Sequence, residues 1–143
     1  MTSEADKLAR RVAEAMLANE GTGAAWGIVL EEARLGYARI SMRLRPDMMN
    51  GHGSAHGGIS FALADTAFAY ACNSRNQTSV AHQASISYLA GARIGETLIA
   101  EAVETALVGR TGVYHVSVRT ADGRAIAEFM GTSRTIGGPY LKE

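Results

Sequence analysis

The sequence predicts an α+β fold in which one long helix lies across a curved antiparallel sheet. An apolar stretch over residues 57–73 has the length of a helix. Its Ala, Leu and Phe side chains occupy nearly every side, so we expect it to be largely buried. Strand-like runs with short loops lie before and after it, which favours antiparallel pairing. A chain of 143 residues can bury a sizeable core, so we expect residues 1–143 to form a single domain.

The N-terminal part of the domain is predicted to be an amphipathic helix over residues 3–19. Ser3 and Asp6 resemble a capping box at its start, and the segment 21–23, Gly-Thr-Gly, ends it. Apolar residues recur at helical spacing along one side, at Leu8, Val12, Ala15 and Met16. The helix therefore has one face suited to packing on the sheet.

Strands are predicted from runs in which apolar and polar residues alternate. Two of them, 26–34 and 36–45, precede the Gly-rich loop 47–58. Four more follow the apolar helix, at 79–89, 96–107, 111–120 and 124–135. Asp122-Gly123 between the last two is typical of a tight hairpin, and residues 137–143 are expected to be a loose tail.

Composition and charge exclude several classes of function. Fourteen basic and fourteen acidic residues cancel, which removes the global charge that nucleic-acid or anionic-membrane binding favours. The apolar stretch at 59–72 is too short to span a membrane, and the charged N-terminus is not a secretory signal. Cys72 is the single cysteine, which fits a reducing compartment. We expect a soluble cytoplasmic protein with neither a nucleic-acid nor a membrane partner.

Asp65 is the most informative residue of the chain. It is the only formal charge between Met48 and Ser74, in the middle of the apolar helix. An ionised side chain there costs several kcal/mol unless something compensates for the lost hydration. Asp65 is therefore either paired with an arginine of the sheet, as a structural element, or placed for chemistry.

The glycines that open the same helix add a second chemical element. The backbone N–H groups of Gly57 and Gly58 lie at its positive end, where they could bind a developing oxyanion. With a carboxylate as base or nucleophile, these groups suit acyl transfer to water. Asp65 follows Gly57 by eight residues, roughly 12 Å along a helix. One carbonyl cannot touch both in one chain, so the site is expected between two copies related by a two-fold axis.

Other sites are less well supported by the sequence. His52 and His56 are four residues apart, but they lack the adjacent Glu of zinc proteases and a third ligand, so no metal is expected. The Gly-rich loop matches neither the dinucleotide nor the P-loop template, and no serine elbow is present. Cys72 lies late in the apolar helix and is interpreted as a small core residue.

Several segments together resemble the hotdog-fold acyl-CoA thioesterases, and most of all their phenylacetyl-CoA thioesterase branch of phenylacetate catabolism. They are Asn50-Gly51-His52-Gly53, His56-Gly57-Gly58, the run from Leu63 to Ser74, Gly109-Arg110-Thr111-Gly112-Val113-Tyr114, and Arg134 with Ile136-Gly137-Gly138. The resemblance implies a hotdog fold, in which a curved antiparallel sheet wraps a long central helix. It also implies a homodimer that joins two sheets, with two dimers assembled into a homotetramer.

The resemblance also implies roles for individual residues. Asp65 would be the catalytic carboxylate, as base or nucleophile, and the Gly57 N–H would polarise the thioester carbonyl. Asn50 and His56 would help to place the carbonyl or the water. Contacts to CoA, which is part of the substrate and not a cofactor, are implied for Asn73, Ser74, Arg110 and Thr111.

Three functions remain open at this point. The first is hydrolysis of aryl or phenylacetyl-type acyl-CoA, in which aromatic residues of the helix either line an acyl pocket or pack in the core (Phe61, Phe68 and Tyr70). The second is non-catalytic binding of acyl-CoA or an aromatic ligand on the same fold. The third is a hotdog hydratase or dehydratase, which would need a His–carboxylate pair.

Overall fold

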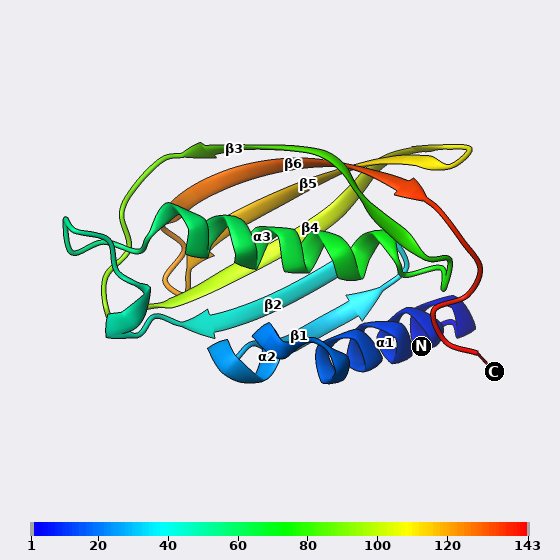
Figure 1. The fold of residues 1–143 in the computed structure, drawn as a ribbon, viewed down its shortest axis with the longest axis horizontal. Coiled ribbons are helices and arrows are strands. Elements are labelled where there is room, and N and C mark those ends of the chain that lie inside the picture. Colours follow the sequence, from blue (N-terminus) through cyan, green and yellow to red (C-terminus); the bar gives the residue numbers. More distant parts are fainter. Residues whose placement is uncertain (1, 143) are drawn as a thin grey trace.

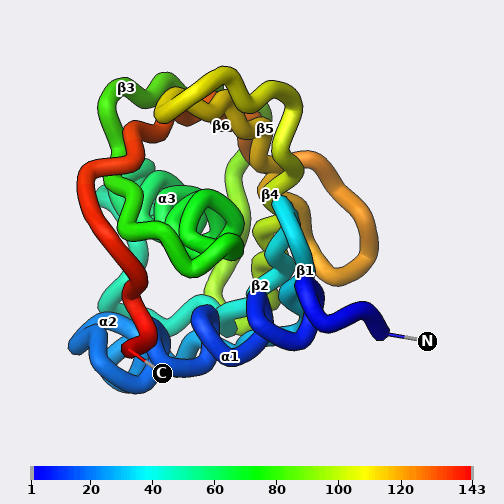
Figure 2. Tube along the Cα trace, turned by 90° about the vertical axis from the view of Figure 1, so that its right-hand side faces the viewer, coloured from blue at the N-terminus to red at the C-terminus, as the bar shows by residue number. Residues whose placement is uncertain are grey.

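The computed structural model describes residues 2–142. Its elements, in chain order, are α1 (Glu4–Asn19), α2 (Gly21–Trp26), β1 (Val29–Arg34), β2 (Tyr37–Arg43), η1 (Pro46–Met48), α3 (Gly57–Cys72), β3 (Ser79–Tyr88), β4 (Thr97–Val108), β5 (Thr111–Thr120) and β6 (Ala125–Thr135). The strands form one six-stranded sheet in the order β1-β2-β4-β5-β6-β3, in which each neighbouring pair is antiparallel. The sheet curves around α3 (Figures 1 and 2), which confirms the predicted architecture.

The core lies between α3 and the concave face of the sheet. Phe68 of α3 is fully buried, and its ring centroid lies 5.5 Å from that of Tyr114 and 5.8 Å from that of Phe129. A Cβ atom on Gly131 of β6 would lie 2.9 Å from the Phe68 ring. The helix can therefore approach the sheet this closely only because position 131 has no side chain.

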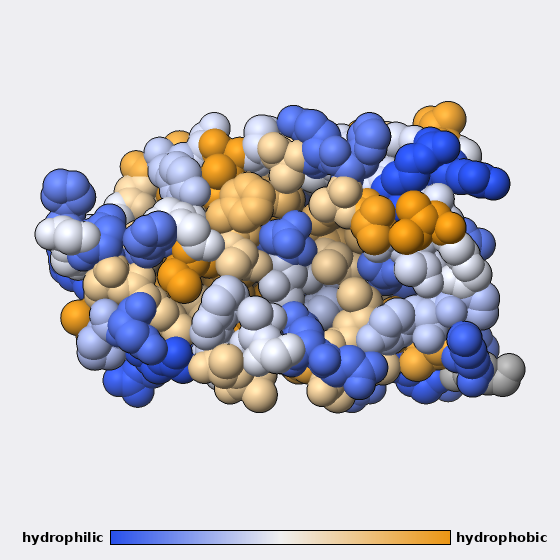
Figure 3. Space-filling view, in the orientation of Figure 1, coloured by the Kyte–Doolittle hydropathy of each residue, from blue (hydrophilic) through white to orange (hydrophobic). Residues whose placement is uncertain are grey.

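The helix α3 is largely buried, as the sequence predicts, except along one side. Within one chain, a stripe of its residues is only half-buried: Ala62, Asp65, Thr66 and Ala69. Figure 3 shows apolar side chains gathered on this face of the molecule between hydrophilic rims. The apolar residues of α3 thus lie on two faces: one packs on the sheet, and the other is open in the single chain.

The N-terminal helices differ from the prediction beyond the first turn of α1. The Ser3 hydroxyl caps α1 by accepting from the Asp6 N–H at 3.1 Å. The Asp6 carboxylate also accepts from the Leu35 N–H at 2.9 Å, which ties α1 to the β1–β2 turn. The segment 21–26, predicted as a helix stop and a strand start, forms the short helix α2.

The C-terminal residues are not the loose tail that the sequence predicts. The Ile136 N–H donates to Thr78, and Asn76 exchanges two hydrogen bonds with the backbone of Leu141. The Tyr140 hydroxyl accepts from the Asn19 side chain at 3.0 Å. The tail therefore crosses from β6 to the end of α1, as Figure 2 shows.

The part of the chain that the structure describes contains neither a membrane-spanning helix nor a cluster of metal ligands. No helix within residues 2–142 has the length and apolarity needed to cross a membrane. The same residues contain no cluster of three His, Cys, Asp or Glu side chains suited to a metal ion.

Candidate active site

Asp65 faces a cavity of about 380 Å³ between α3 and the N-terminal helices. Burial raises the pKa of its carboxyl above the ordinary value of 3.8. No residue from 2 to 142 donates a hydrogen bond to this carboxylate or forms an ion pair with it. The described residues therefore give no support to the alternative in which an arginine of the sheet holds Asp65, and its acceptor atoms are available to a ligand.

His56 caps the start of α3 and leaves one N–H group free there. Its Nδ1 atom accepts from the Gly58 N–H at 2.9 Å, and its carbonyl accepts from the N–H groups of Ile59 and Ser60 at 2.9 and 3.3 Å. The expectation that both glycine N–H groups are free is thus wrong for Gly58. The Gly57 N–H has no acceptor among the described residues, so it is the donor that the helix start offers to a ligand.

Asn50 organises the loop that precedes α3. Its Oδ1 atom accepts from the N–H groups of His52 and Ser54 at 2.9 and 3.1 Å. Its amide NH₂ group remains able to donate. Asn50 and Gly57 line the same cavity, of about 420 Å³, so the structure brings these two predicted site residues together.

Tyr88 is a site residue that sequence reasoning missed. It ends β3, and its hydroxyl donates to the Gly57 carbonyl at 2.9 Å. A Cβ atom on Gly57 would lie 3.1 Å from the Tyr88 ring. The tyrosine thereby holds the first peptide of α3 in place. Its position 31 residues after Gly57 gives no local pattern from which this contact could be predicted.

The Gly57 and Asp65 groups are not brought together within one chain. They line different cavities, and their separation of eight residues on one helix corresponds to roughly 12 Å. The geometry of the single chain thus agrees with the expectation that one reacting carbonyl cannot touch both.

Asn73 and Ser74, for which CoA contacts were implied, have structural partners at the end of α3. Asn73 is buried and exchanges hydrogen bonds with the backbone of Ser79 at 2.9 and 3.0 Å. The buried Ser74 hydroxyl accepts from the Gly36 N–H at 2.9 Å. These contacts turn both side chains inward within the single chain.

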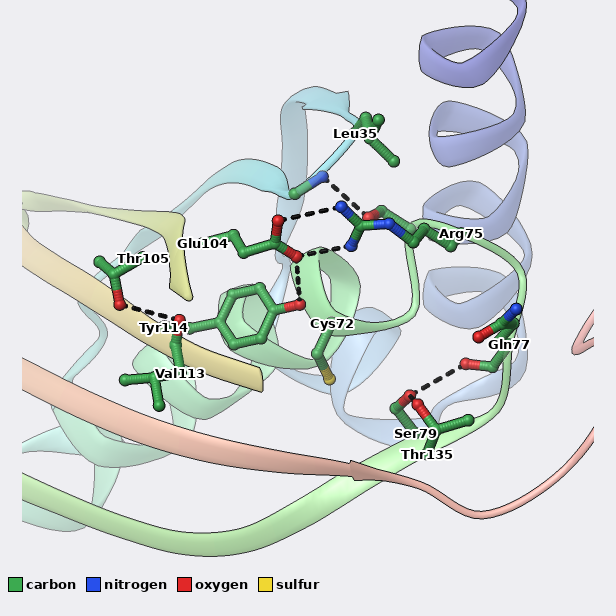
Figure 4. A network of polar contacts seen from close by, with 12 residues as sticks. Leu35, Cys72, Arg75, Gln77, Ser79, Glu104, Thr105, Val113, Tyr114 and Thr135 are labelled. Atoms are coloured by element: carbon green, nitrogen blue, oxygen red, sulfur yellow. Dashed lines mark hydrogen bonds and ion pairs between the residues drawn. The ribbon is translucent and has the colours of Figure 1, made fainter. Parts of the chain in front are cut away.

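The other two positions with implied CoA contacts, Arg110 and Thr111, lie at the β4–β5 turn. Arg110 is exposed and lines a cavity of about 540 Å³ together with the glycines of the C-terminal segment. The neighbouring Arg75 is engaged by Glu104 at 2.5 and 2.9 Å, and Tyr114 donates to the same carboxylate at 2.8 Å (Figure 4). Arg110 has no ion-pair partner among residues 2–142, so its charge is available to an anion.

Two of the remaining candidates, Cys72 and Phe68, lie in the core. Burial raises the pKa of the Cys72 thiol to about 12, which keeps it protonated and supports its interpretation as a small core residue. Phe68 packs on the sheet, as described above, and Phe61 lies 5.4 Å from the Phe129 ring centroid. Of the three aromatic residues considered for an acyl pocket, Tyr70 lines the Asp65 cavity.

Comparison with known proteins identifies the family. Residues 52–127 match the family model described as the Thioesterase superfamily. The chain is 40% identical over 131 residues to the acyl-coenzyme A thioesterase PaaI of Escherichia coli (strain K12), which covers 92% of this chain and 94% of that relative. The protein therefore belongs to the thioesterase superfamily.

Solved structures agree with this assignment. The E. coli PaaI protein from the phenylacetic acid degradation operon matches with a TM-score of 0.93 and 38% identity, covering 95% of this chain and 99% of that chain. The TT0310 protein of Thermus thermophilus matches with a TM-score of 0.79 and 36% identity, covering 82% and 99%. The fold is the hotdog fold that the resemblance implied.

Proposed function

We propose that the protein hydrolyses the thioester of arylacetyl-type acyl-CoA, with phenylacetyl-CoA as the reference substrate, to the free acid and CoA. The observation that carries this proposal is the Asp65 carboxylate, which is half-buried, faces a cavity and has no partner among residues 2–142. The E. coli relative is named an acyl-coenzyme A thioesterase, and its structure is described as coming from the phenylacetic acid degradation operon. These names support both the reaction and the acyl class.

The proposed site lies between two copies of the chain. The strand β3 offers an edge for joining their sheets, because most of its side chains are exposed and no strand within residues 2–142 pairs with its outer edge. In a two-fold dimer the start of α3 in each copy would face Asp65 of the other, which gives two equivalent sites. Assembly of dimers into a homotetramer and a cytoplasmic location are parts of this proposal.

The chemistry follows from the two groups. The Gly57 N–H of one copy binds the thioester oxygen and stabilises the oxyanion of the tetrahedral intermediate. Asp65 of the other copy takes a proton from water, whose oxygen attacks the carbonyl carbon, or it attacks directly to form a mixed anhydride that water then hydrolyses. In both routes the C–S bond breaks and the CoA sulfur leaves as thiolate, which takes up a proton.

The proposed CoA contacts lie at the β4–β5 turn. Arg110 would bind a phosphate of CoA, because its guanidinium is exposed and carries no ion pair within residues 2–142. Thr111 beside it offers a hydroxyl for the same moiety. His56, whose Nδ1 caps α3, is engaged in a structural contact, which disfavours the His–carboxylate pair that a hydratase needs.

The test combines a side-chain variant with a backbone variant. Asp65→Asn removes the base, and we expect the release of CoA thiol from phenylacetyl-CoA to fall by on the order of 10²–10⁴. Gly57→Pro removes the N–H at the first helical position, where proline is tolerated. We expect a loss of about 10²–10³ in kcat.

The control for the proline is Gly57→Ala, which adds the same Cβ atom beside Tyr88 but keeps the N–H. We expect it to retain most of the activity of the unmodified protein. Thiol release by Asp65→Asn at the unmodified rate, with correct folding, would refute the role of Asp65. Equal losses in the proline and alanine variants would refute the role of the N–H.

A further inference from the structure

We propose that Glu20 is a specificity-determining residue, which contacts the far end of the acyl group in the Asp65 cavity. It favours acyl groups that end in a hydrogen-bond donor and rejects those that end in a carboxylate. This inference rests on the proposed function, because it places the acyl group in that cavity. It concerns the elbow between α1 and α2, to which none of the preceding site residues belongs.

The elbow holds the Glu20 carboxylate in a defined position. The residue ends α1 and begins α2, and its N–H donates to the Met16 carbonyl at 3.0 Å. Its carboxylate accepts from the Tyr70 hydroxyl through one oxygen and from the Thr22 hydroxyl, at 2.9 Å, through the other. Two donors from different elements therefore fix the acceptor atoms before any ligand binds.

The same cavity contains both Glu20 and Asp65. Its walls include apolar side chains from both sides, Met16 and Trp26 from the N-terminal helices and alanines from α3. Tyr70, which contacts Glu20, follows Asp65 by five residues, or roughly 7.5 Å along the helix axis. That separation is close to the length of an arylacetyl group from its carbonyl carbon to the far edge of its ring.

The charge of the cavity sets the preference. Two carboxylates line it, Asp65 and Glu20, whereas no Lys or Arg from residues 2–142 does. A carboxylate has about four acceptor positions, so each Glu20 oxygen can accept a further bond from a ligand O–H or N–H. An acyl group ending in a carboxylate would instead meet like charge in a partly desolvated site. The cavity thus distinguishes acyl groups by the charge and the hydrogen-bonding groups at their far end.

The experiment measures binding, so that its outcome is separate from the hydrolysis test. In the Asp65→Asn background, Kd is measured by calorimetry for phenylacetyl-CoA and for its derivatives with a 4-hydroxyl or a 4-carboxyl group on the ring. We expect the hydroxyl derivative to bind most tightly and the carboxyl derivative least. Adding Glu20→Gln should reduce the ratio of the Kd of the carboxyl derivative to the Kd of the hydroxyl derivative by about tenfold, as expected for loss of a charged acceptor.

The matched control is Glu14→Gln, which removes an exposed carboxylate from the same helix and should leave the ratio unchanged. Tyr70→Phe removes one donor to Glu20 but keeps its charge, so rejection of the carboxyl derivative should persist. The proposal is overturned if the Asp65→Asn protein with Glu20 intact binds the carboxyl derivative as tightly as phenylacetyl-CoA. It is also overturned if Glu20→Gln folds correctly and leaves the ratio within twofold. A folded protein that binds these ligands with the expected preferences but hydrolyses none of them would contradict only the proposed reaction.

Discussion

At the scale of single residues, the Asp65 carboxylate is the group on which the proposed chemistry depends. It is half-buried in the single chain, and nothing in the described residues compensates for its lost hydration. Burial without a partner raises a carboxyl pKa, because it disfavours the charged form. The group is therefore kept at a cost in stability, as is common for residues retained for function.

This cost gives a prediction about stability and pH. The pKa of Asp65 is raised in the folded state above 3.8, so the wild-type chain loses stability as the pH rises from the unfolded pKa through that raised value. Asp65→Asn should therefore raise Tm at pH 7, by about 2–4 °C, and the gain should vanish below the unfolded pKa near 4. Thermal unfolding of both proteins across this pH range, followed by circular dichroism, measures the difference.

Asp47→Asn serves as a control of opposite sign. Its hydrogen bonds from Arg45 lower the pKa of the Asp47 carboxyl, so removal of the charge should decrease Tm at neutral pH and have no effect at low pH. If Asp65→Asn behaved in the same way, the carboxylate would have a stabilising partner, and its interpretation as an unpaired group would be wrong.

The site residues that could be predicted from sequence are those marked by short-range patterns. A single charge in an apolar helix identified Asp65, and a glycine pair at the helix start identified Gly57. The cap that His56 forms on the Gly58 N–H depends on a rotamer that residue type does not determine. The contact of Tyr88 with Gly57 depends on the path of β3 past α3, which no short-range pattern contains.

At the scale of elements, the close approach of α3 to the sheet explains how its long apolar pattern is used. A Cβ atom at Gly131 would lie 2.9 Å from two atoms of the buried Phe68 ring and 3.0 Å from the Phe129 ring. Neither ring is free to move, because both are enclosed in the core. The spacing between helix and sheet is therefore set by this glycine.

Gly131→Ala should accordingly destabilise the fold. Overpacking of a tight core by one methyl group costs about 1–3 kcal/mol, which denaturant unfolding can measure. Gly138→Ala, where a Cβ atom would meet nothing within 4 Å, is the matched control and should change stability little. A Gly131→Ala variant as stable as the control would show that the helix can move away from the sheet at no cost.

Elements with strong periodicity were predictable, and those held by distant contacts were not. The long helices and the β-strands follow from apolar spacing that burial enforces. The segment 21–26 contains two glycines, which have poor helix propensity, yet it is helical. There, and in the tail that contacts Asn76 and Asn19, tertiary contacts override local preference.

At the scale of the whole molecule, the single chain keeps the two proposed catalytic groups apart. Asp65 and Gly57 open into different cavities, and the β3 edge is unpaired within residues 2–142. The spacing of eight residues from Gly57 to Asp65 on one helix already predicts that the two groups lie apart. Which surfaces would join in the proposed dimer was not predictable from periodicity, because the open stripe of α3 departs from an apolar pattern only at Asp65 and Thr66.

Complementation between two inactive variants tests the central claim most directly. Asp65→Asn and Gly57→Pro chains are mixed in equal amounts, unfolded and refolded together, and thiol release from phenylacetyl-CoA is measured. Half of the dimers would then be mixed, and each would contain one site with both Asp65 and the Gly57 N–H. We expect the mixture to recover about one quarter of wild-type activity. If Asp65 and the N–H acted within one chain, or if the two groups were not partners in one site, the mixture would stay as inactive as either variant alone.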